Sequence, residues 1–447
     1  MVDVEVNAIG GYEEVGRNMT AIRVNKDIVV IDMGLRLDRI AIHEDAEIEK
    51  MSPIDLIKMG AIPNDAPLSQ SKRAVKAVIC THGHLDHIGA VPKLVHRYDA
   101  PIIATPFTAE LIAQQIQAEK KFGVENPLYT LEAGQVYQIT PDIAVEFVRA
   151  THSIPDPIIA VLHTPAGAIV YANDFKLDRT PVIGKPPDFN RLKSLGREGV
   201  LALIVESTRV KELGKTPSEQ IAKDLVRDVL LGTEEEDKGV LVTTFSSHIA
   251  RVKTIFEAAQ EMGRRPLILG RSMERYLGTA ERMGYVELPN DIGVYGNRRS
   301  VDKILKRVMQ EGKDKYLPIV TGHQGEPEAM LTRVASGLTP YQVTPGDKIV
   351  FSAEVIPTPI NAANRYSLET KLKMRGSRLY TNVHVSGHAA REDHWELINM
   401  LKPSHIFPTH GDLTMTSSYV ELAEEAGYSL RDNIHLLRNG QNISVRP

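Results

Sequence analysis

The chain has 447 residues, of which 42% are hydrophobic and 25% are charged, and its formal net charge at pH 7 is −4. At ~100–200 residues per domain, this length predicts two or three domains. The single cysteine excludes an internal disulfide framework and a cysteine-rich zinc finger. Mild acidity argues against a surface that is basic throughout, and the lack of any run of ~18 apolar residues argues against a membrane span. Residues 1–5 are acidic and already alternate between apolar and charged side chains, so we expect no secretory signal. We therefore expect a cytoplasmic protein with no membrane partner.

Short strands separated by loops and helices dominate the first 200 residues. Apolar or alternating runs predict strands, and the apolar run 74–80 predicts a buried one. The expected strands span 2–9, 19–24, 27–31, 74–80, 102–104, 136–139, 143–149, 158–164 and 168–172, with helical segments at 88–98 and 108–121. Such alternation is typical of a layered α/β architecture.

From about residue 201 the pattern changes to a second α/β unit. Its helix is expected at 218–231, and its strands are expected at 201–205, 239–244, 266–269, 317–320 and 348–352. Strands separated by helical segments in this way are typical of a doubly wound sheet. The last part returns to histidine-bearing strand–loop pieces at 379–384, 405–410 and 434–437. Without a repeat or a low-complexity linker between the two units, we interpret the second as an insertion into the first.

The segment from His82 to His87 carries the strongest local signal. It reads His-Gly-His-Leu-Asp-His, so that four metal-binding side chains follow an expected buried strand within six residues. Imidazole and carboxylate ligands without thiolates suit a hydrolytic Zn²⁺ or Mn²⁺ site, and the spacing differs from the helical histidine pair of thermolysin-like enzymes. We expect Gly83 to let the backbone turn tightly enough to aim alternate side chains at one point. The plainer alternative is a polar loop in which Asp86 caps the next helix.

Three more candidate ligands, His152, Asp174 and His410, each follow an expected strand elsewhere in the chain. Sites of α/β sheets lie at the ends of strands, so these side chains are candidates for the same site as the His82–His87 segment. A carboxylate such as Asp174 can bridge two cations, whereas an imidazole cannot. Two metals ~3.5–4 Å apart would clamp an attacking hydroxide and polarise a phosphoryl oxygen.

Taken in chain order, Asp32, the His82–His87 segment, His152, Asp174 and His410 resemble the five motifs of the metallo-β-lactamase superfamily. The resemblance implies an αββα sandwich with two divalent metal ions, Zn²⁺ in the first place and Mn²⁺ or Mg²⁺ as alternatives. It implies that one metal is held by His82, His84 and His152, the other by Asp86, His87 and His410, with Asp174 as the bridge. Asp32 is expected to orient ligands without binding metal. Asn173 stands where many relatives carry glycine, and we expect it to alter a loop and not the chemistry.

The chain from Glu206 onward resembles the β-CASP group, the branch of this superfamily that cleaves nucleic acids. Glu206 at a strand end matches motif A, His388 within Val-Ser-Gly-His-Ala matches motif B, and His410 matches motif C. The resemblance implies a metallo-β-lactamase domain in two parts, 1–206 and 378–447, with an α/β β-CASP domain inserted at 207–377.

The same resemblance implies catalytic roles for Asp86, His388 and Glu206. His388 would stabilise charge on the scissile phosphate or protonate the departing oxygen. Glu206 would orient His388 or partner a metal ligand. A core histidine satisfied by hydrogen bonds is the alternative for His388.

Three segments resemble the ribonuclease J family within that group: 244–249 (Thr-Phe-Ser-Ser-His-Ile), 322–327 (Gly-His-Gln-Gly-Glu-Pro) and 384–388 (His-Val-Ser-Gly-His). The resemblance implies a pocket for the 5′-monophosphate of RNA, formed by Ser246, Ser247, His384, Ser386, Gly387 and His388. Short hydroxyl donors and backbone N–H groups suit a phosphate, although turn and cap roles are the alternative for the serines. The sequence stops soon after His410, and we expect the compact archaeal form of the family without an added RNA-binding module.

This resemblance implies a two-metal 5′–3′ exoribonuclease that acts on single-stranded RNA with a 5′-monophosphate. It would release 5′-mononucleotides in RNA decay and maturation, and a homodimer is expected. One alternative is an endoribonuclease of the 3′-end-processing type or a dual activity at the same site. A small-molecule metallo-hydrolase is disfavoured, because an insertion of this size would bury a small active site.

Residues 263–316 form a basic stretch, with twelve Lys and Arg against seven Asp and Glu. The candidates to follow an RNA backbone are Arg264, Arg265, Arg271, Arg275, Arg298 and Arg299. A solvated helical face is the alternative for Lys303, Lys306 and Arg307, which recur at helical spacing.

Overall fold

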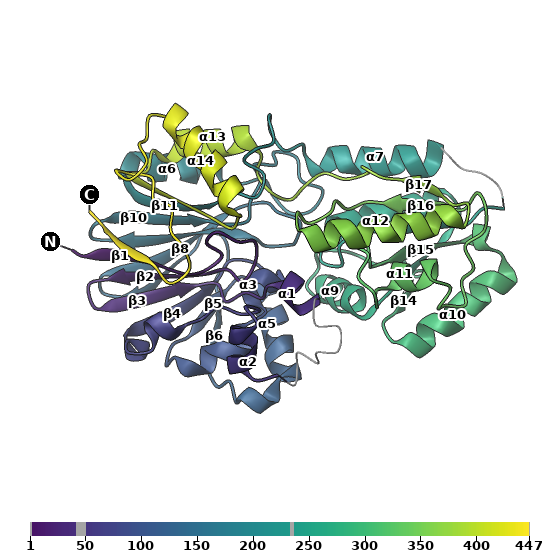
Figure 1. The fold of residues 1–447 in the computed structure, drawn as a ribbon, viewed down its shortest axis with the longest axis horizontal. Helices are drawn as coiled ribbons and strands as arrows, with labels where there is room; N and C mark the ends of the chain where they lie inside the picture. Colours follow the sequence, from purple (N-terminus) through teal and green to yellow (C-terminus); the bar gives the residue numbers. More distant parts are fainter. Residues whose placement is uncertain (1, 42–50, 233–236, 447) are drawn as a thin grey trace. The chain divides into compact units, whose positions relative to one another are not determined.

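The computed structural model describes residues 2–41, 51–232 and 237–446, and the chain forms two compact units (Figure 1). The first unit comprises Met1–Arg179, Lys185–Thr216 and Gly387–Pro447, and the second comprises Thr180–Gly184 and Pro217–Ser386. The chain thus leaves the first unit and returns to it. The domain limits expected from the sequence, at residues 206 and 378, differ from the limits of these compact units and remain a prediction.

The first unit contains two facing sheets. The seven-stranded sheet has the order β19-β1-β2-β3-β4-β5-β6, and the six-stranded sheet has the order β18-β11-β10-β9-β8-β7. The strands of the first sheet are β1 (Val4–Gly10), β2 (Met19–Val24), β3 (Asp27–Ile31), β4 (Val75–Cys80), β5 (Ile102–Ala104), β6 (Leu128–Thr130) and β19 (Asn442–Val445). Those of the second are β7 (Val136–Thr140), β8 (Ile143–Arg149), β9 (Ile158–Thr164), β10 (Gly167–Ala172), β11 (Val200–Glu206) and β18 (His405–Thr409).

Apolar side chains from both sheets meet in one core. Val6 and Ile31 of the first sheet lie in the same buried cluster as Phe147, Tyr171 and Phe407 of the second. Burying this much apolar surface between two layers is the main force that holds them together.

Helices cover the outer faces of these sheets. Apolar residues of α6 (Phe189–Glu198), α13 (Arg391–Leu401) and α14 (Leu413–Glu425) share a second core with β10 and β11, while α5 (Pro106–Ala118) packs on β5 and β6. The order helix–sheet–sheet–helix is the predicted αββα sandwich. The unit's shorter helices are α1 (Leu37–Ala41), α2 (Pro53–Lys58), α3 (Leu85–Ile88) and α4 (Val91–Leu94).

The second unit is built on a single parallel sheet with the order β14-β13-β15-β12-β16-β17. Its strands are β12 (Val240–Thr243), β13 (Arg265–Leu269), β14 (Gly293–Tyr295), β15 (Tyr316–Val320), β16 (Lys348–Phe351) and β17 (Arg378–Tyr380). Its helices are α7 (Glu219–Gly232), α8 (Ile249–Glu261), α9 (Arg271–Arg282), α10 (Arg298–Glu311), α11 (Met330–Ala335) and α12 (Pro359–Met374). A parallel sheet needs both faces covered, and its strands all end at one edge.

Several predicted elements differ from those in the structure. The helix expected at 88–98 is divided into α3, α4 and a 3₁₀ turn, Val95–Arg97. In the strand–loop piece expected at 379–384, the strand is β17, which ends at Tyr380, and His384 lies in the loop that follows. The strand–loop piece expected at 434–437 has only isolated bridges at Ile434, and the terminal strand is β19. Short edge strands such as β6 and β14 were missed, because three partly exposed residues form neither an apolar run nor a clear alternation. The equally short β5 is fully buried and was predicted.

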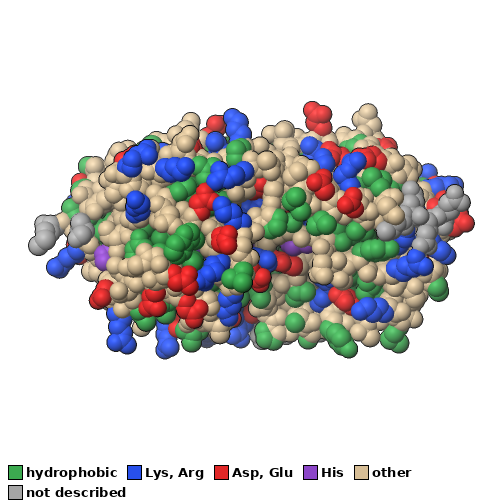
Figure 2. All heavy atoms as spheres, turned by 90° about the horizontal axis from the view of Figure 1, so that it is seen from above, with side chains coloured by type: hydrophobic (Ala, Val, Ile, Leu, Met, Phe, Trp, Pro, Cys, Tyr) green, Lys and Arg blue, Asp and Glu red, His purple; other side chains and the backbone are tan. Residues whose placement is uncertain are grey.

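Within the described ranges, no helix is both long and apolar enough to cross a lipid bilayer. On the face shown in Figure 2, basic and acidic side chains are interspersed.

Candidate metal centre

The candidate ligands come together because neighbouring parallel strands in each sheet end at the same edge. Ile31 of β3 pairs with Ile79 of β4, which places Asp32 beside the start of the His82–His87 segment. In the second sheet Glu206 of β11 pairs with Thr409 of β18, the residue before His410. Register therefore brings residues that are far apart in sequence to one edge of the sandwich.

Gly83 serves close packing at this edge. A Cβ atom at this position would lie 2.4 Å from Leu111 Cδ1 and 3.2 Å from Ile154 Cδ1. Its φ angle lies outside the left-handed region. The backbone bends at His82 and Gly83. Glycine is needed here because the backbone passes directly against α5, and not because the bend requires a left-handed φ angle.

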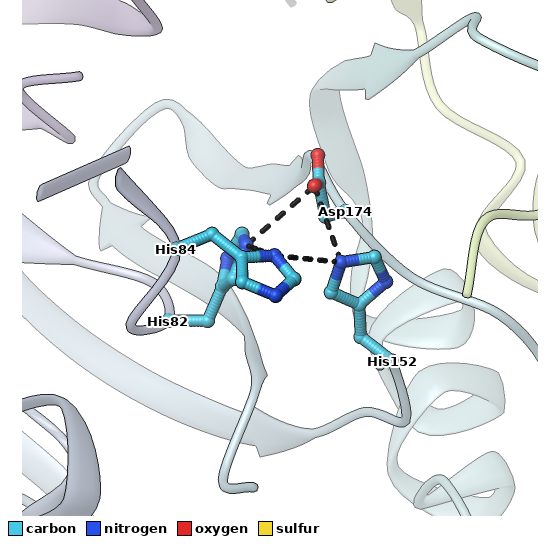
Figure 3. A group of neighbouring side chains, drawn as sticks. All are labelled: His82, His84, His152 and Asp174. Carbon is cyan, nitrogen blue, oxygen red and sulfur yellow. Dashed lines mark hydrogen bonds and ion pairs between the residues drawn. The ribbon is translucent and has the colours of Figure 1, made fainter. Parts of the chain in front are cut away.

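The first group of ligands consists of His82, His84, His152 and Asp174 (Figure 3). His84 Nδ1 lies 3.2 Å from His82 Nε2 and 3.1 Å from His152 Nε2. Asp174 Oδ2 lies 3.5 Å from His82 Nε2 and 3.4 Å from His152 Nε2. Ligand atoms that each sit ~2.0–2.2 Å from a tetrahedral Zn²⁺ are spaced by ~3.3–3.6 Å. The two Asp174 separations lie in this range, and the two His84 separations are slightly shorter.

The second group consists of Asp86, His87, Asp174 and His410. Asp174 Oδ1 lies 3.3 Å from His87 Nε2 and 3.5 Å from His410 Nε2. Asp86 Oδ2 lies 3.5 and 3.7 Å from the same two nitrogens. Asp174 thus offers one oxygen to each group, which is the geometry that a bridging carboxylate needs.

The buried oxygen Asp174 Oδ1 makes no hydrogen bond within the described part of the chain. A buried carboxylate oxygen that lacks a hydrogen bond is costly unless a cation neutralises it. This orphaned atom, together with the nitrogen and oxygen donors around it, fits divalent metal binding.

Hydrogen bonds orient the imidazoles from outside the two groups. Asp32 Oδ2 lies 2.8 Å from His87 Nδ1 and is itself held by the Thr81 hydroxyl. His152 Nδ1 lies 2.8 Å from the Gly387 carbonyl, and His410 Nδ1 lies 2.9 Å from Asn18 Oδ1. Partners of this kind fix the ring orientation and leave the opposite nitrogen for a metal. Asn18 and the Gly387 carbonyl were not foreseen, since neither belongs to a recognisable motif.

Backbone strain accompanies these contacts. Asp32 and His410 have φ angles of 61° and 47°. Residues with side chains are uncommon in this left-handed region and occur there mainly where surrounding contacts enforce them.

The protonation of the site suits a cation. Burial lowers the pKa values of His82, His84 and His152, which favours the neutral imidazole that binds metal. Burial would raise the pKa of Asp174, but the neighbouring histidines, His87 first, hold it well below the usual range. His87 differs, because the carboxylates around it raise its pKa despite burial. A cation there would have to displace a proton.

A third group joins Asp174 to Glu206 and His388. Glu206 is fully buried, and its Oε2 lies 2.6 Å from His388 Nδ1 and also accepts from the Thr208 hydroxyl. His388 Nε2 lies 4.0 Å from Asp174 Oδ2, and the side chain is 25% exposed. Burial opposes the imidazolium charge, but Glu206 and then Asp174 raise the pKa of His388 to about 9. Glu206 is therefore positioned to orient His388.

The residues of the expected 5′-phosphate pocket belong to both units. Ser246, Ser247, His384 and Ser386 lie in the second unit, and Gly387 and His388 lie in the first. His384 is fixed within its own unit, where Nδ1 lies 3.1 Å from Arg251 Nη1. The pocket as a whole remains a prediction.

The basic stretch needs one correction. Arg264 is only 4% exposed, and its Nη1 donates to the Lys238 carbonyl, so its side chain is buried in the second unit and is not available to follow an RNA backbone. Of the predicted set, Arg271, Arg275 and Arg298 line one cavity.

Fold and site together define a class: a metallo-β-lactamase-type hydrolase with an inserted β-CASP domain. Residues 12–172 match the metallo-β-lactamase superfamily, residues 237–367 match the β-CASP domain of ribonuclease J, and residues 372–436 match the RNA specificity domain of Zn-dependent metallo-hydrolases. Ribonuclease J of Methanocaldococcus jannaschii is 54% identical over 99% of this chain and 98% of its own length. Ribonuclease J of Pyrococcus abyssi is 50% identical over 99% of this chain and 97% of its own length. Ribonuclease J2 of Bacillus subtilis is 31% identical over 99% of this chain and 75% of its own length.

The chain belongs to the ribonuclease J family. It is accordingly a metal-dependent ribonuclease, and its most similar relatives named here are archaeal. The fold is also similar to that of a protein of unknown function from Enterococcus faecalis, with a TM-score of 0.64 at 17% identity over 99% of this chain and 100% of the other.

Proposed function

We propose that the chain is a two-metal 5′–3′ exoribonuclease that acts on single-stranded RNA with a 5′-monophosphate and releases 5′-mononucleotides in RNA decay and maturation. The observation that carries the two-metal part is Asp174, whose two oxygens face two separate donor groups. His82, His84 and His152 would hold one cation, Asp86, His87 and His410 the other, and Asp174 both. When bound, the two cations supply an activated water and polarise the scissile phosphate.

His388 and Glu206 carry the proton chemistry of this proposal. Glu206 accepts a hydrogen bond from Nδ1 of His388. The other ring nitrogen, Nε2, lies 4.0 Å from Asp174 Oδ2, and the side chain is partly exposed. An imidazolium in this position can donate its Nε2 proton to the departing 3′-oxygen. Asp32, Asn18 and the Gly387 carbonyl keep the neighbouring rings fixed while this happens.

The preference for the 5′ end would come from the predicted pocket of Ser246, Ser247, His384, Ser386, Gly387 and His388. Hydroxyl and backbone N–H donors match the acceptors of a terminal phosphate. A pocket one nucleotide from the metals would measure off a mononucleotide in each cycle. The alternative is endonucleolytic or dual cleavage at the same centre.

One experiment separates these alternatives. RNA of one sequence carrying a 5′-monophosphate or a 5′-hydroxyl is incubated with the purified protein and Zn²⁺, Mn²⁺ or Mg²⁺. The proposal expects 5′-mononucleotides as the first products and faster decay of the monophosphorylated RNA. Internal fragments that form at equal rates from both RNAs would overturn it.

We also propose that the native cations are Zn²⁺, that the protein is a homodimer and that it acts in the cytoplasm. The all-imidazole-and-carboxylate donor set supports Zn²⁺. Metal analysis of the purified protein and multi-angle light scattering test the first two statements, and cell fractionation tests the third.

A further inference from the structure

The second unit contains a cavity of about 470 Å³ that the proposed reaction does not use. Its lining residues lie where β13, β14 and β15 end and where α9, α10 and α11 begin. Open α/β sheets bind ligands at this edge, outside the carboxyl ends of the strands. The volume lies in the ~300–1,000 Å³ range of small-molecule sites.

Four arginines line the cavity: Arg271, Arg275, Arg298 and Arg333. Within the described ranges, none of the four has a carboxylate at ion-pair distance, although Glu328 also lines the cavity and Glu274 lies directly against Gly296. Other cations of this unit pair with carboxylates, for example the buried Arg251 with Glu219 and the half-buried Lys313 with Asp347. The cavity therefore has an excess of positive charge that the described chain leaves unbalanced.

Arg333 shows this most clearly. Its side chain is buried, with the residue only 8% exposed, and its one hydrogen bond among the described residues is a long one, 3.5 Å from Nη2 to the Leu338 carbonyl. The Nε atom of Arg275 is likewise buried without a hydrogen-bond partner in the described chain. Burying a guanidinium is costly unless it meets an anion, so these groups are arranged for a negatively charged ligand.

The backbone adds to the same field. The twelve-residue helix α9 starts after Gly270, which provides no side-chain cap, at the wall of the cavity. The first N–H groups of a helix lack intrahelical partners and carry partial positive charge, which favours phosphate. Val301, Ala329 and Met330 supply an apolar part of the wall.

We propose that this cavity binds a compact ligand with two or more phosphate groups, such as a nucleoside di- or triphosphate. Four arginines around one small cavity can balance the three or four negative charges that such a ligand concentrates in its phosphate chain. A single RNA strand carries only one charge per nucleotide, spread along its backbone, and so suits this arrangement less well. The apolar wall would contact the nucleoside. The proposal does not rest on the direction or end preference of RNA cleavage.

Calorimetric titration of the full-length metal-loaded protein tests the proposal. The probes are ATP, inorganic pyrophosphate and a short RNA with a 5′-hydroxyl. The variants are Arg333→Gln and the exposed Arg298→Gln, which keeps the test valid if Arg333→Gln fails to fold. Arg307→Gln is the control, because it removes the same charge from α10 at a position that is paired with Glu311 outside the cavity.

We expect ATP and pyrophosphate to bind, with Kd raised at least tenfold by either cavity variant and unchanged by Arg307→Gln. Binding that neither cavity variant weakens would place the ligand elsewhere, the metal centre included, and overturn the proposal. The absence of ATP and pyrophosphate binding would also overturn the proposal. So would cavity variants that weaken binding of the RNA probe alone, because the arginines would then contact the RNA backbone.

Discussion

Asp174 is the residue on which the proposed metal centre depends most. Its two oxygens face two sets of imidazoles, and one of them makes no hydrogen bond in the described structure. An amide at this position would offer one oxygen and a nitrogen that repels cations.

We therefore expect Asp174→Asn to reduce bound metal well below that of the unaltered protein and to lower RNA cleavage to background. Metal content by mass spectrometry and cleavage rate are the two readouts. Asp188→Asn is the matched control, since an asparagine can still cap α6 as Asp188 does. Full metal content in Asp174→Asn would contradict the bridging role.

His388 gives a different expectation at the same scale, because it faces the cluster without belonging to either set of four ligands. Loss of a general acid lowers kcat by ~10²–10⁴-fold, while metal content should not change. His388→Ala is compared with His405→Ala, a histidine at the start of β18 that bonds to the Arg446 carbonyl. A His388→Ala protein with unchanged kcat would exclude the proposed proton donor.

At the scale of elements, an ion-pair network ties α6 to the second sheet of the first unit. Glu146 of β8 accepts from Arg191 of α6 at 2.6 and 2.9 Å and lies 2.7 Å from His163 of β9. Burial works against the charge of Glu146, yet the hydrogen bonds from His163 and Arg191 lower its pKa from 4.5 to about 2.

A depressed folded-state pKa means that this carboxylate stabilises the fold above pH 4.5 and loses its contribution as the pH falls toward 2. We expect Glu146→Gln to cost roughly 1–3 kcal/mol at pH 7 and much less near pH 2. Thermal unfolding midpoints at both pH values measure this, with the exposed Glu132→Gln as control. An equal loss at both pH values would show that the charge of Glu146 is not the cause.

The elements also show what could be predicted from the sequence. Buried strands such as β4, β8 and β11 were recognisable from apolar runs, and the αββα sandwich with its inserted α/β unit is confirmed. The ligand candidates were recognisable because several lie within one short segment and the others follow strands.

Other features have no local signal. The Gly387 carbonyl that holds His152 is a backbone atom. Asn18 meets His410 only because the ends of β2 and β18, which belong to different sheets, come together in the fold. Arg264 belongs to a basic stretch that looks exposed in the sequence, but its side chain is buried and bonds to the Lys238 carbonyl. The buried Arg333, which lies outside the basic stretch, joins three arginines of that stretch only when the second unit folds.

At the scale of the whole molecule, the expected 5′-phosphate pocket takes residues from both units of the chain. If Ser386 contacts the terminal phosphate, Ser386→Ala removes a hydrogen bond to a charged group, worth ~1.5–3 kcal/mol, and kcat/KM should fall ~10–100-fold for RNA with a 5′-monophosphate. RNA with a 5′-hydroxyl should be cleaved as before. Equal losses on both RNAs would assign Ser386 to the fold alone, and the exposed Ser69→Ala serves as the control.

The central claim is that cleavage begins at a free 5′ end, and a covalently closed RNA tests it most directly. One sequence is prepared as a linear RNA with a 5′-monophosphate and as a circle, and both are incubated with the metal-loaded protein. The account predicts that the linear RNA is converted to 5′-mononucleotides while the circle stays intact. Cleavage of the circle at a rate comparable to that of the linear RNA would contradict it.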